Sequence, residues 1–405
     1  MTPHAPTTTR QRWLFVLILG ALRGLGPFTV DLYLPAFPQV EADLGINTAA
    51  VQLTLTATAL GFALGQLVVG PWSDRVGRRL PIILATTLHI AASLGVALTH
   101  DYHLLLFFRG LQGAGAAAGA VVAMAMVRDL FAGHRMVRVL ARLALVTGLA
   151  PILAPVVGSQ LMRWTSWRGI FVVLAAFGAL VWLCTVLFIP ETLPRARRHA
   201  AERGATVARY KILFADRAFI GVALIGGMVF SGLFAYLSSS SFLFQQVYHL
   251  DAQDYGLLFA TNSLGIVAGA QASARLAQRI GPQWVLVAAT AVLLAASGAI
   301  VLLDLAGAGL FGVLVPLWIF LMTCGLAMPC IQVLALAEHG AQAGTAASLL
   351  GAVNFGLAGV ISPVIGLFGI TDAVPMGATM AATSAVAILS LWILVRPRSV
   401  PALAP

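Results

Sequence analysis

The most regular feature of the chain is a series of long apolar runs separated by short polar segments. A helix needs about 20 apolar residues to cross the hydrocarbon core of a bilayer. The runs have this length, and they lack the apolar–polar alternation of a transmembrane β-strand. The pattern therefore predicts an all-α membrane protein. Its twelve transmembrane helices are expected at about residues 13–37, 49–71, 80–98, 103–126, 137–162, 167–189, 217–242, 254–275, 283–303, 308–334, 344–368 and 374–395.

The positive charges orient these helices. Of the 24 Lys and Arg residues, only Arg163 and Arg168 lie in or at the edge of an odd-numbered gap between predicted helices, and only Arg23 and Arg109 lie well inside helices. All the others lie in the even-numbered gaps, in the helix ends that border those gaps, or in the two tails. Because cytoplasmic loops carry an excess of Lys and Arg, we expect a multi-pass protein of the bacterial inner membrane with both termini in the cytoplasm.

The longest polar segment falls midway along the chain and is rich in arginine. It separates two sets of six predicted helices. The expected parts are an N-terminal half, a cytoplasmic linker and a C-terminal half, at residues 1–190, 191–216 and 217–405. Within the linker, Val207, Tyr210 and Phe214 recur at helical spacing, which favours a short amphipathic helix on the cytoplasmic face.

The composition of the chain argues against some classes of binding partner. The chain is 60% hydrophobic and 9% charged, whereas soluble domains carry about 25% charged residues. The net charge of +10 is spread over short loops rather than gathered on a basic helix with aromatic residues, so nucleic-acid binding is not expected. The three cysteines lie in apolar runs without metal-ligand spacing, so we expect no metal and no cofactor.

Three ionisable residues inside predicted helices are the first candidates for chemistry, because each costs about 2.5–3.5 kcal/mol on membrane-insertion scales. They are Arg23, Asp31 and Arg109. Asp31 is either a carboxylate that binds and releases a coupling proton or one member of a fixed ion pair. Arg109 shares a helix face with Gln112, and it either takes part in coupling or only organises helix packing.

A second candidate lies between the second and third predicted helices. Glycine and proline there predict a tight turn. Asp74 is expected to cap a helix N-terminus and to bond to nearby arginines. The segment is either a cytoplasmic gate or a set of arginines that only enforces topology. The residues assigned to the gate are Gly70, Asp74, Arg75, Gly77 and Arg78.

Two further groups of residues have a structural and a functional interpretation. In the fifth predicted helix, Pro151 and Pro155 remove backbone donors, and with Gly158 they predict a bend.

Asn262 and Asn354 are isolated amides in the second half. Each either contacts substrate or forms a hydrogen bond across helices.

These motifs resemble those of the major facilitator superfamily. The segment 70–79 matches its loop signature G-x-x-x-D-R-x-G-R-R, and residues 109–113 resemble its fourth-helix pattern R-x-x-Q-G. Residues 151–158 look like the fifth-helix signature of drug/proton antiporters. The segment 31–38, Asp-Leu-Tyr-Leu-Pro-Ala-Phe-Pro, resembles the bicyclomycin/chloramphenicol-resistance branch, as do Trp167-Arg168-x-Ile170-Phe171, Pro190-Glu191-Thr192-Leu193 and Gly344-Thr345-Ala346-Ala347-Ser348.

The resemblance implies the major facilitator fold and alternating access by rocking of the two halves. It also implies that Asp31 and Arg109 couple transport to protons and that Asp74 with its arginines closes the cytoplasmic side. The second-half counterpart of the loop signature keeps only Arg275, Arg279 and Gly281, without an acid. The residues expected to line the substrate cavity are Arg23, Asp31, Tyr33, Gln112, Asn262 and Asn354.

Together these features predict a proton-coupled efflux transporter, a drug/proton antiporter for small amphipathic compounds such as antibiotics. We expect it to act as a monomer in the lipid bilayer, with the proton as coupling ion. One alternative is a dedicated exporter or importer of one metabolite, such as a nucleoside, sugar or amino acid. A more remote one is a membrane enzyme or receptor. No convergent set of nucleophile, base and metal ligands is visible to support an enzyme.

Overall fold

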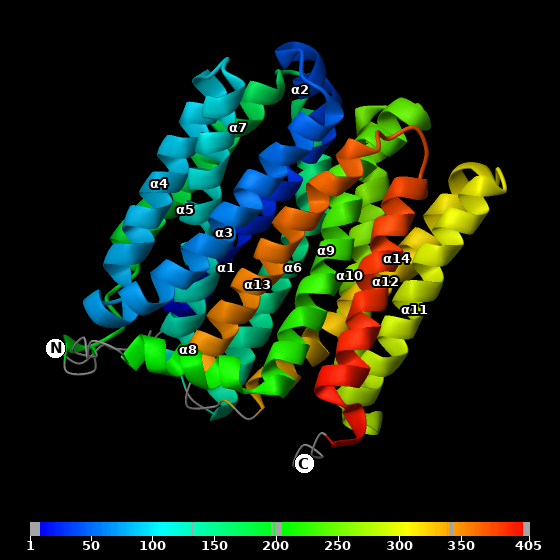
Figure 1. The fold of residues 1–405 in the computed structure, drawn as a ribbon. Helices are drawn as coiled ribbons and strands as arrows, with labels where there is room; N and C mark the ends of the chain where they lie inside the picture. Colours follow the sequence, from blue (N-terminus) through cyan, green and yellow to red (C-terminus); the bar gives the residue numbers. More distant parts are fainter. Residues whose placement is uncertain are drawn as a thin grey trace. The chain divides into compact units, whose positions relative to one another are not determined.

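The architecture was taken from a computed structural model, which describes residues 9–131, 133–195, 198, 205–337, 339 and 343–399. These residues form helices and no strand (Figure 1). Eleven of the described helices are long and apolar enough to cross a membrane. A shorter apolar helix, Gly148–Leu161 within α6, lies where the remaining span was predicted. The predicted all-α membrane protein with twelve transmembrane helices is therefore confirmed.

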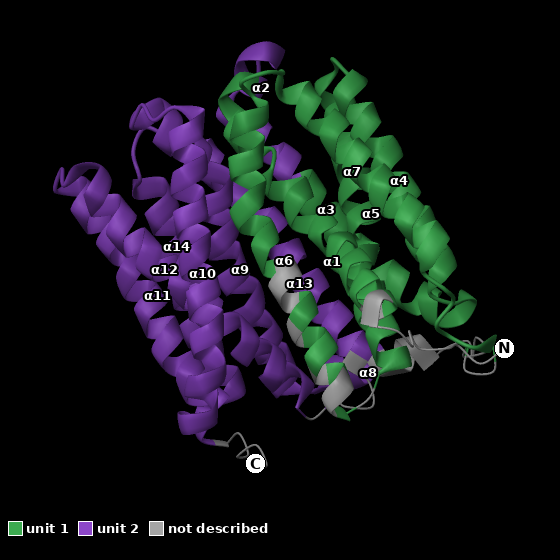
Figure 2. Ribbon diagram, turned by 180° about the vertical axis from the view of Figure 1, so that it is seen from behind, with its two compact units in different colours: residues 1–39, 57–206 green, residues 40–56, 207–405 purple. Residues whose placement is uncertain are grey.

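Contacts between residues divide the chain into two compact units (Figure 2). Unit 1 contains residues 1–39 and 57–206, and unit 2 contains residues 40–56 and 207–405. The helices of the first half are α1 (Thr9–Asp31), α2 (Phe37–Leu44), α3 (Thr48–Val76), α4 (Arg79–Leu98), α5 (Tyr102–Leu130), α6 (Gly133–Leu161) and α7 (Trp167–Phe188). Those that follow are α8 (Ala205–Ala215), α9 (Arg217–Phe242), α10 (Ala252–Ile280), α11 (Pro282–Leu305), α12 (Gly309–Leu336), α13 (Ala343–Leu367) and α14 (Val374–Ser390).

The first predicted span is interrupted. Helix α1 ends at Asp31, a 3-10 turn follows at Leu34–Ala36, and α2 then continues to Leu44. Proline has no backbone N–H to donate within an α-helix and its ring clashes with the preceding turn, and Pro35 lies at the start of this 3-10 turn. The break places Asp31 at the end of a helix rather than in its middle.

Small residues let the helices of unit 1 approach closely. A Cβ on Gly119 of α5 would collide with the carbonyl oxygen of Leu22 in α1, and one on Gly113 would collide with that of Thr58 in α3. Small residues at four-residue spacing commonly serve this purpose in membrane proteins. The glycines of α5 therefore bring α1 and α3 against the helix that carries Arg109.

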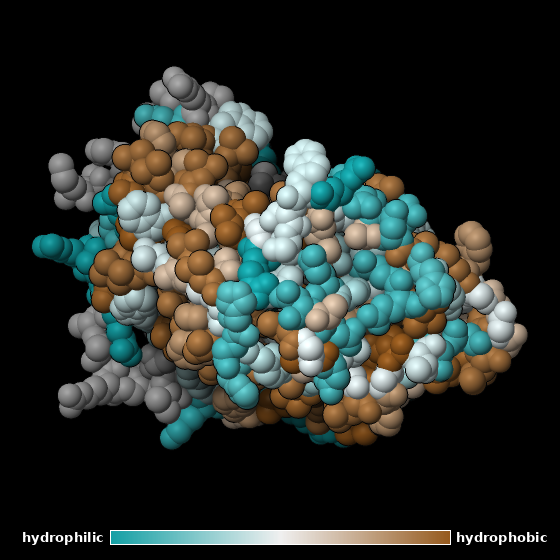
Figure 3. All heavy atoms as spheres, turned by 90° about the horizontal axis from the view of Figure 1, so that it is seen from above, coloured by the Kyte–Doolittle hydropathy of each residue, from teal (hydrophilic) through white to brown (hydrophobic). Residues whose placement is uncertain are grey.

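Large apolar side chains remain exposed along the helices of both units. Leu64, Phe107, Leu257 and Leu302 are all more than half exposed, at 64%, 58%, 60% and 69%. In the view from above, hydrophilic residues gather over one part of the face, while hydrophobic residues cover much of the rest and parts of the edge (Figure 3). Side chains of this kind on the flanks are expected where the solvent is lipid rather than water.

Helix α8 lies within the segment predicted to be the linker. Its residue Leu213 is fully buried, whereas Phe214 is 58% exposed. The side chain of Val207 lies outside the described residues, so the amphipathic character of this helix stays a prediction.

Candidate functional site

The turn between α3 and α4 is built around Gly77. Its φ of +104° lies in the region that favours glycine. A Cβ there would also collide with the side chains of Glu191 and Arg198. Gly77 therefore lets the α3–α4 turn lie directly against the segment that follows α7.

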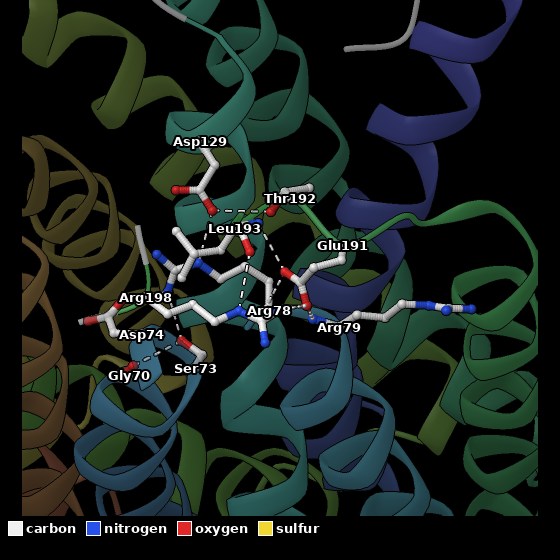
Figure 4. A network of polar contacts seen from close by, with 10 residues as sticks. All are labelled: Gly70, Ser73, Asp74, Arg78, Arg79, Asp129, Glu191, Thr192, Leu193 and Arg198. Atoms are coloured by element: carbon white, nitrogen blue, oxygen red, sulfur yellow. Dashed lines mark hydrogen bonds and ion pairs between the residues drawn. The ribbon is translucent and has the colours of Figure 1, made fainter. Parts of the chain in front are cut away.

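Arg78 is the centre of a polar network at this turn (Figure 4). Its Nη1 donates to Asp74 Oδ1 and, over 2.9 Å, to Ser73 Oγ. Its Nε donates to Asp129 Oδ2 over 2.9 Å. Burial alone would lower the pKa of Arg78, but the hydrogen bonds and charges of Asp129 and Asp74 outweigh it and raise the pKa. Arg78 is therefore a permanent cation held between two carboxylates.

Glu191 occupies the N-terminus of α4. Its Oε1 accepts hydrogen bonds from the backbone N–H groups of Arg78 (2.8 Å) and Leu193 (2.9 Å), and its Oε2 accepts one from the N–H of Arg79 (3.3 Å). Its Oε2 also lies 3.6 Å from Nη2 of Arg198. A carboxylate at a helix N-terminus satisfies free N–H groups and complements the helix dipole. Glu191 thus caps α4 from a position 113 residues away along the chain.

Two predictions for this segment were wrong. Gly70 and Pro71 lie inside α3, which continues to Val76, so the tight turn is at Gly77 instead. Asp74 lies in the last turn of α3 rather than at a helix N-terminus. The capping role belongs to Glu191, because its carboxylate reaches the free N–H groups from another part of the chain.

The five residues assigned to the gate separate into two groups. Asp74, Gly77 and Arg78 belong to the network, whereas Gly70 contributes only a carbonyl that accepts from Ser73 Oγ at 2.9 Å. Arg75 is exposed, and no hydrogen bond or ion pair links it to the part of the chain that the structure describes. Sequence reasoning missed Asp129 as a site residue and did not assign Glu191 to the gate. The available signal was two acids at the ends of predicted helices, on the arginine-rich side.

The two acids that bind Arg78 differ in exposure, so we expect their replacement to impair transport to different extents. The side chain of Asp129 is 13% exposed and that of Asp74 is 40% exposed. Asp129 also accepts a hydrogen bond from Thr192 Oγ1 at 3.1 Å. We therefore expect Asp129→Asn to impair transport in membrane vesicles several-fold more than Asp74→Asn, with both proteins still inserted, because burial strengthens charge-assisted bonds. If both variants transport as well as the parent, the charges of this turn serve only to orient the protein in the membrane.

A second polar cluster lies inside unit 1, around Arg109. This side chain is fully buried. Its Nη1 donates to the carbonyl oxygen of Thr29 at 3.1 Å and to Gln112 Oε1 at 2.5 Å. Its guanidinium carbon lies 4.8 Å from the ring centre of Tyr33 and 5.4 Å from that of Phe171, within the range of cation–π attraction. Aromatic rings and neutral acceptors thus surround the charge.

Gln112 extends this cluster toward α4. Its Nε2 donates to Ser93 Oγ at 2.7 Å, and Ser93 in turn donates to the carbonyl oxygen of His89 at 2.7 Å. The Nδ1 atom of His89 lies 3.3 Å from the carbonyl oxygen of Gln112. All three side chains are fully buried. The predicted pair Arg109 and Gln112 therefore forms a connected network that links α1, α4 and α5.

Asp31 belongs to the segment that contacts this network, but its own side chain does not join the network. Arg109 contacts the carbonyl of Thr29, two residues before Asp31, and the ring of Tyr33, two residues after it. Asp31 is 6% exposed, and its carboxylate has no hydrogen bond or ion pair with any described residue. The Nε and Nη2 atoms of Arg109 are buried without a hydrogen-bond partner in the structure as described. Arg109 thus contacts the chain on either side of Asp31, but the structure shows no contact between the Asp31 carboxylate and the Arg109 guanidinium.

The proline-containing helix α6 approaches the same region. Pro151 and Pro155 both lie inside the continuous helix. A Cβ on Gly158 would collide with the carbonyl oxygen of Leu32, the residue after Asp31. Gly158 thus lets α6 lie against the end of α1, next to the buried acid.

The remaining residues predicted for the cavity are distributed over both units. In unit 1, Arg23 is partly buried and its Nε has no hydrogen-bond partner among the described residues, while Tyr33 is fully buried. In unit 2, Asn262 Nδ2 donates to the hydroxyl of Tyr236 at 3.1 Å. Asn354 Oδ1 is buried without a partner in the described structure. Their assignment to a common cavity stays a prediction.

A family model and several related proteins assign the chain to the same family. The model of the Major Facilitator Superfamily matches residues 17–363. The chain is 35% identical to an uncharacterized MFS-type transporter, YdgK of Bacillus subtilis, over 98% of each chain. It is 28% identical to the bicyclomycin resistance protein homolog of Haemophilus influenzae, over 95% of this chain and 97% of that one. It is also 31% identical to the multidrug resistance protein MdtL of Salmonella typhimurium, over 61% and 62% of the two chains.

Solved structures share the fold at low sequence identity. The xylose transporter XylE from E. coli, in a partially occluded inward-open conformation, matches with a TM-score of 0.75 and 11% identity over 97% of this chain and 99% of that one. An inward-facing bacterial homolog of the human lysosomal transporter Spinster matches with a TM-score of 0.71 and 16% identity, over 98% and 100%. The predicted major facilitator fold is confirmed. The chain therefore belongs to the major facilitator superfamily, and its relatives support the bicyclomycin-resistance branch that the motifs indicated.

Proposed function

We propose that this transporter is a proton-coupled exporter of small amphipathic compounds, including antibiotics. The observation that carries the proposal is the placement of Asp31, an acid at the end of the first membrane-crossing helix that is almost fully buried and forms no ion pair with a described residue. Burying an ionisable group in a membrane protein is costly and commonly marks a proton or ion pathway. The relatives named as bicyclomycin- and multidrug-resistance proteins support export of drugs as the use of this pathway.

The neighbourhood of Asp31 suggests how a proton controls the protein. Arg109 is the cation that we propose as the partner of ionised Asp31 in one conformation of the cycle, because its Nε and Nη2 have no partner among the described residues. Arg109 is already held by Thr29 and Gln112. In this proposal, protonation of Asp31 removes its attraction for Arg109 and so changes how α1 and α5 are held together. In an alternating-access cycle, proton binding and release at Asp31 select between the two conformations.

The charges within the first unit also bear on the substrate. Arg23, Asp31 and Arg109 are the charged residues of this unit that the sequence places well inside membrane-crossing helices. Cationic compounds would meet more repulsion than attraction there. We propose neutral or weakly acidic compounds as substrates, with the proton as coupling ion and no further cofactor.

The charge bias supports the orientation and the location. With Lys and Arg concentrated in the even-numbered gaps and tails, both termini face the cytoplasm of a bacterial inner membrane under the positive-inside rule. In this orientation the Arg78 network lies on the cytoplasmic side. The protein acts there as a monomer, and the network stabilises the state in which this side is closed.

A resistance screen tests the function. A pump-deficient bacterial host that expresses the chain should tolerate several-fold higher concentrations of one or more neutral or weakly acidic antibiotics than the same host with an empty vector. Purified protein in proteoliposomes should then move these compounds in response to an imposed proton gradient. If no antibiotic is tolerated better, and flux is instead limited to one sugar, nucleoside or amino acid, the drug-export proposal is wrong.

A further inference from the structure

Two neighbouring helix ends of unit 1 carry arginines and no acid. Helices α1 and α6 both belong to this unit and pack against each other (Figure 2). Asp and Glu are absent from residues 1–30 and from residues 130–190. The arginines at the beginning of α6 therefore have no ion-pair partner on α6 itself or on the adjoining part of α1.

Arg142 of α6 is held against Trp13 of α1. Its guanidinium carbon lies 4.3 Å from the centre of the Trp13 ring, within the range of cation–π attraction. Trp13 is 45% exposed, and Arg142 is partly buried. Arg142 has no hydrogen bond or ion pair with any described residue. A guanidinium that stacks on a ring keeps the N–H donors along its edge available for an acceptor from outside the chain.

Arg138 adds a second positive charge on the same face of α6. It lies one turn before Arg142, at the four-residue spacing that places side chains next to each other on a helix. Arg138 is exposed and, like Arg142, is not paired with any residue in the described part of the chain. The last acid before α6 in the sequence is Asp129, and its carboxylate is already bonded to Arg78 and Thr192. No described acid therefore compensates the two guanidinium groups.

Exposed apolar side chains follow these charges along both helices. Leu17 lies one turn after Trp13 in α1 and is 51% exposed, whereas Phe15 between them is only 4% exposed. Leu149 lies two turns after Arg142 in α6 and is 52% exposed. From the beginning of the two helices inward, the surface thus presents cations, an indole ring and then leucines. This order is complementary to a phospholipid, which has an anionic headgroup followed by apolar chains, and Trp is enriched at the level of the headgroups.

An anionic phospholipid accounts for more of this arrangement than a purely topological role for the arginines. Orientation in the membrane requires only that positive charges lie on the cytoplasmic side. It requires neither the stacking of Arg142 on Trp13 nor exposed leucines in line with the charges. A free phosphate ion or an acidic segment of a soluble protein would use the arginines alone, because Leu149 lies about 10 Å farther along the helix axis, toward the hydrocarbon core.

We propose that Trp13, Arg138 and Arg142 bind the phosphate headgroup of an anionic phospholipid of the cytoplasmic leaflet, with an acyl chain along Leu17 and Leu149. The proposal rests on the orientation given above, but not on the nature of the transported compound. Arginine forms paired hydrogen bonds with a phosphate, and a basic residue at an anionic membrane surface strengthens binding roughly fivefold. The two arginines together should therefore favour an anionic over a zwitterionic lipid by about tenfold or more.

Binding of single lipids to the purified full-length chain tests the site. Delipidated protein in a neutral detergent is titrated with phosphatidylglycerol or with phosphatidylcholine of the same acyl chains, and native mass spectrometry gives the dissociation constant of the first bound lipid. Arg138→Ala with Arg142→Ala should weaken phosphatidylglycerol binding about tenfold or more and leave phosphatidylcholine binding unchanged. Trp13→Leu keeps both charges and should also weaken phosphatidylglycerol binding, because it removes the ring that holds Arg142.

Helix α10 offers a matched control. Arg275 and Arg279 have the same four-residue spacing, are exposed, and lie at the end of a helix on the arginine-rich side. Arg275→Ala with Arg279→Ala should leave the affinity for phosphatidylglycerol near the parent value. An equal loss in both double variants would show that only total charge matters and would overturn the site. Displacement of the lipid by inorganic phosphate or by an acidic peptide at a similar concentration would also overturn it, by assigning the arginines to a soluble anion.

A photo-cross-link tests where the lipid lies. In liposomes of equal parts phosphatidylglycerol and phosphatidylcholine, p-benzoylphenylalanine in place of Leu17 or Leu149 should cross-link mainly to phosphatidylglycerol. This preference should be lost in Arg138→Ala with Arg142→Ala. The same probe in place of Leu264, which is 55% exposed on α10, should report the bulk lipid composition, and equal ratios at all three positions would show that no particular lipid is bound. Neither assay needs substrate or a proton gradient, so failure of the lipid site is distinguished from failure of the proposed transport function.

Discussion

Replacing Asp31 with Asn is expected to abolish accumulation of substrate against a gradient. Asparagine keeps the size and hydrogen-bonding capacity of the acid but fixes the neutral state. One proton moving across 100 mV supplies about 2.3 kcal/mol, enough for a gradient of roughly 50-fold. A transporter that cannot load and release this proton loses that driving force. Exchange of substrate down its own gradient, which needs no titration, should survive.

Two measurements in purified protein distinguish coupling from folding. The parent should release protons when substrate is added in weakly buffered detergent solution, and Asp31→Asn should not. Asp254→Asn is a matched control, because Asp254 is an exposed acid in the first turn of α10, and it should behave as the parent does. If Asp31→Asn still transports uphill and still releases protons, the coupling group is elsewhere, and His89 in the Gln112 network is the next residue to test.

Replacing Arg78 with Ala is expected to have the second large effect. The change removes the hydrogen bonds to Asp74, Ser73 and Asp129 together. It leaves Asp129, 13% exposed, without its cation. Removing one partner of a buried pair commonly costs about 3–5 kcal/mol. Transport should fall below detection, and the thermal unfolding midpoint of the purified protein should drop by several degrees.

The chain itself offers controls for Arg78. Arg75→Ala removes an exposed arginine from the same short segment, with an equal change in net charge. It should leave both transport and thermal stability near the parent values. Arg78→Lys keeps the charge but not the planar fork of donors, so it should restore only part of the loss. Equal behaviour of Arg75→Ala and Arg78→Ala would show that only the number of positive charges matters.

The architecture was predictable from the sequence, because the feature that determines it is local. The length of an apolar run is matched to the thickness of a bilayer, so each membrane-crossing helix can be recognised without knowledge of its neighbours. The motifs 70–79 and 109–113 likewise identified Arg78, Arg109 and Gln112 as candidates. These are statements about single segments, and the structure agrees with the number and type of the helices.

The partners of the candidate residues were not predictable, because they depend on distances between segments far apart in the chain. The cap of α4 comes from Glu191, 113 residues from Arg78, and not from the nearby Asp74. Arg109 bonds to a backbone carbonyl of Thr29, 80 residues away. Hydropathy and spacing along the sequence carry no information about such contacts.

The sequence by itself thus determined the twelve helices, their type and the residues that carry charge into the membrane-crossing segments. Only the tertiary structure decided which of those charges are bonded, that Arg109 is held by Thr29 and Gln112 rather than by Asp31, and that residues 40–56 pack in unit 2. The physical reason is the range of the forces. The hydrophobic effect is non-directional and scales with apolar area, so an apolar run predicts its own removal from water. Hydrogen bonds and ion pairs instead act over a few ångströms and depend on how the helices pack.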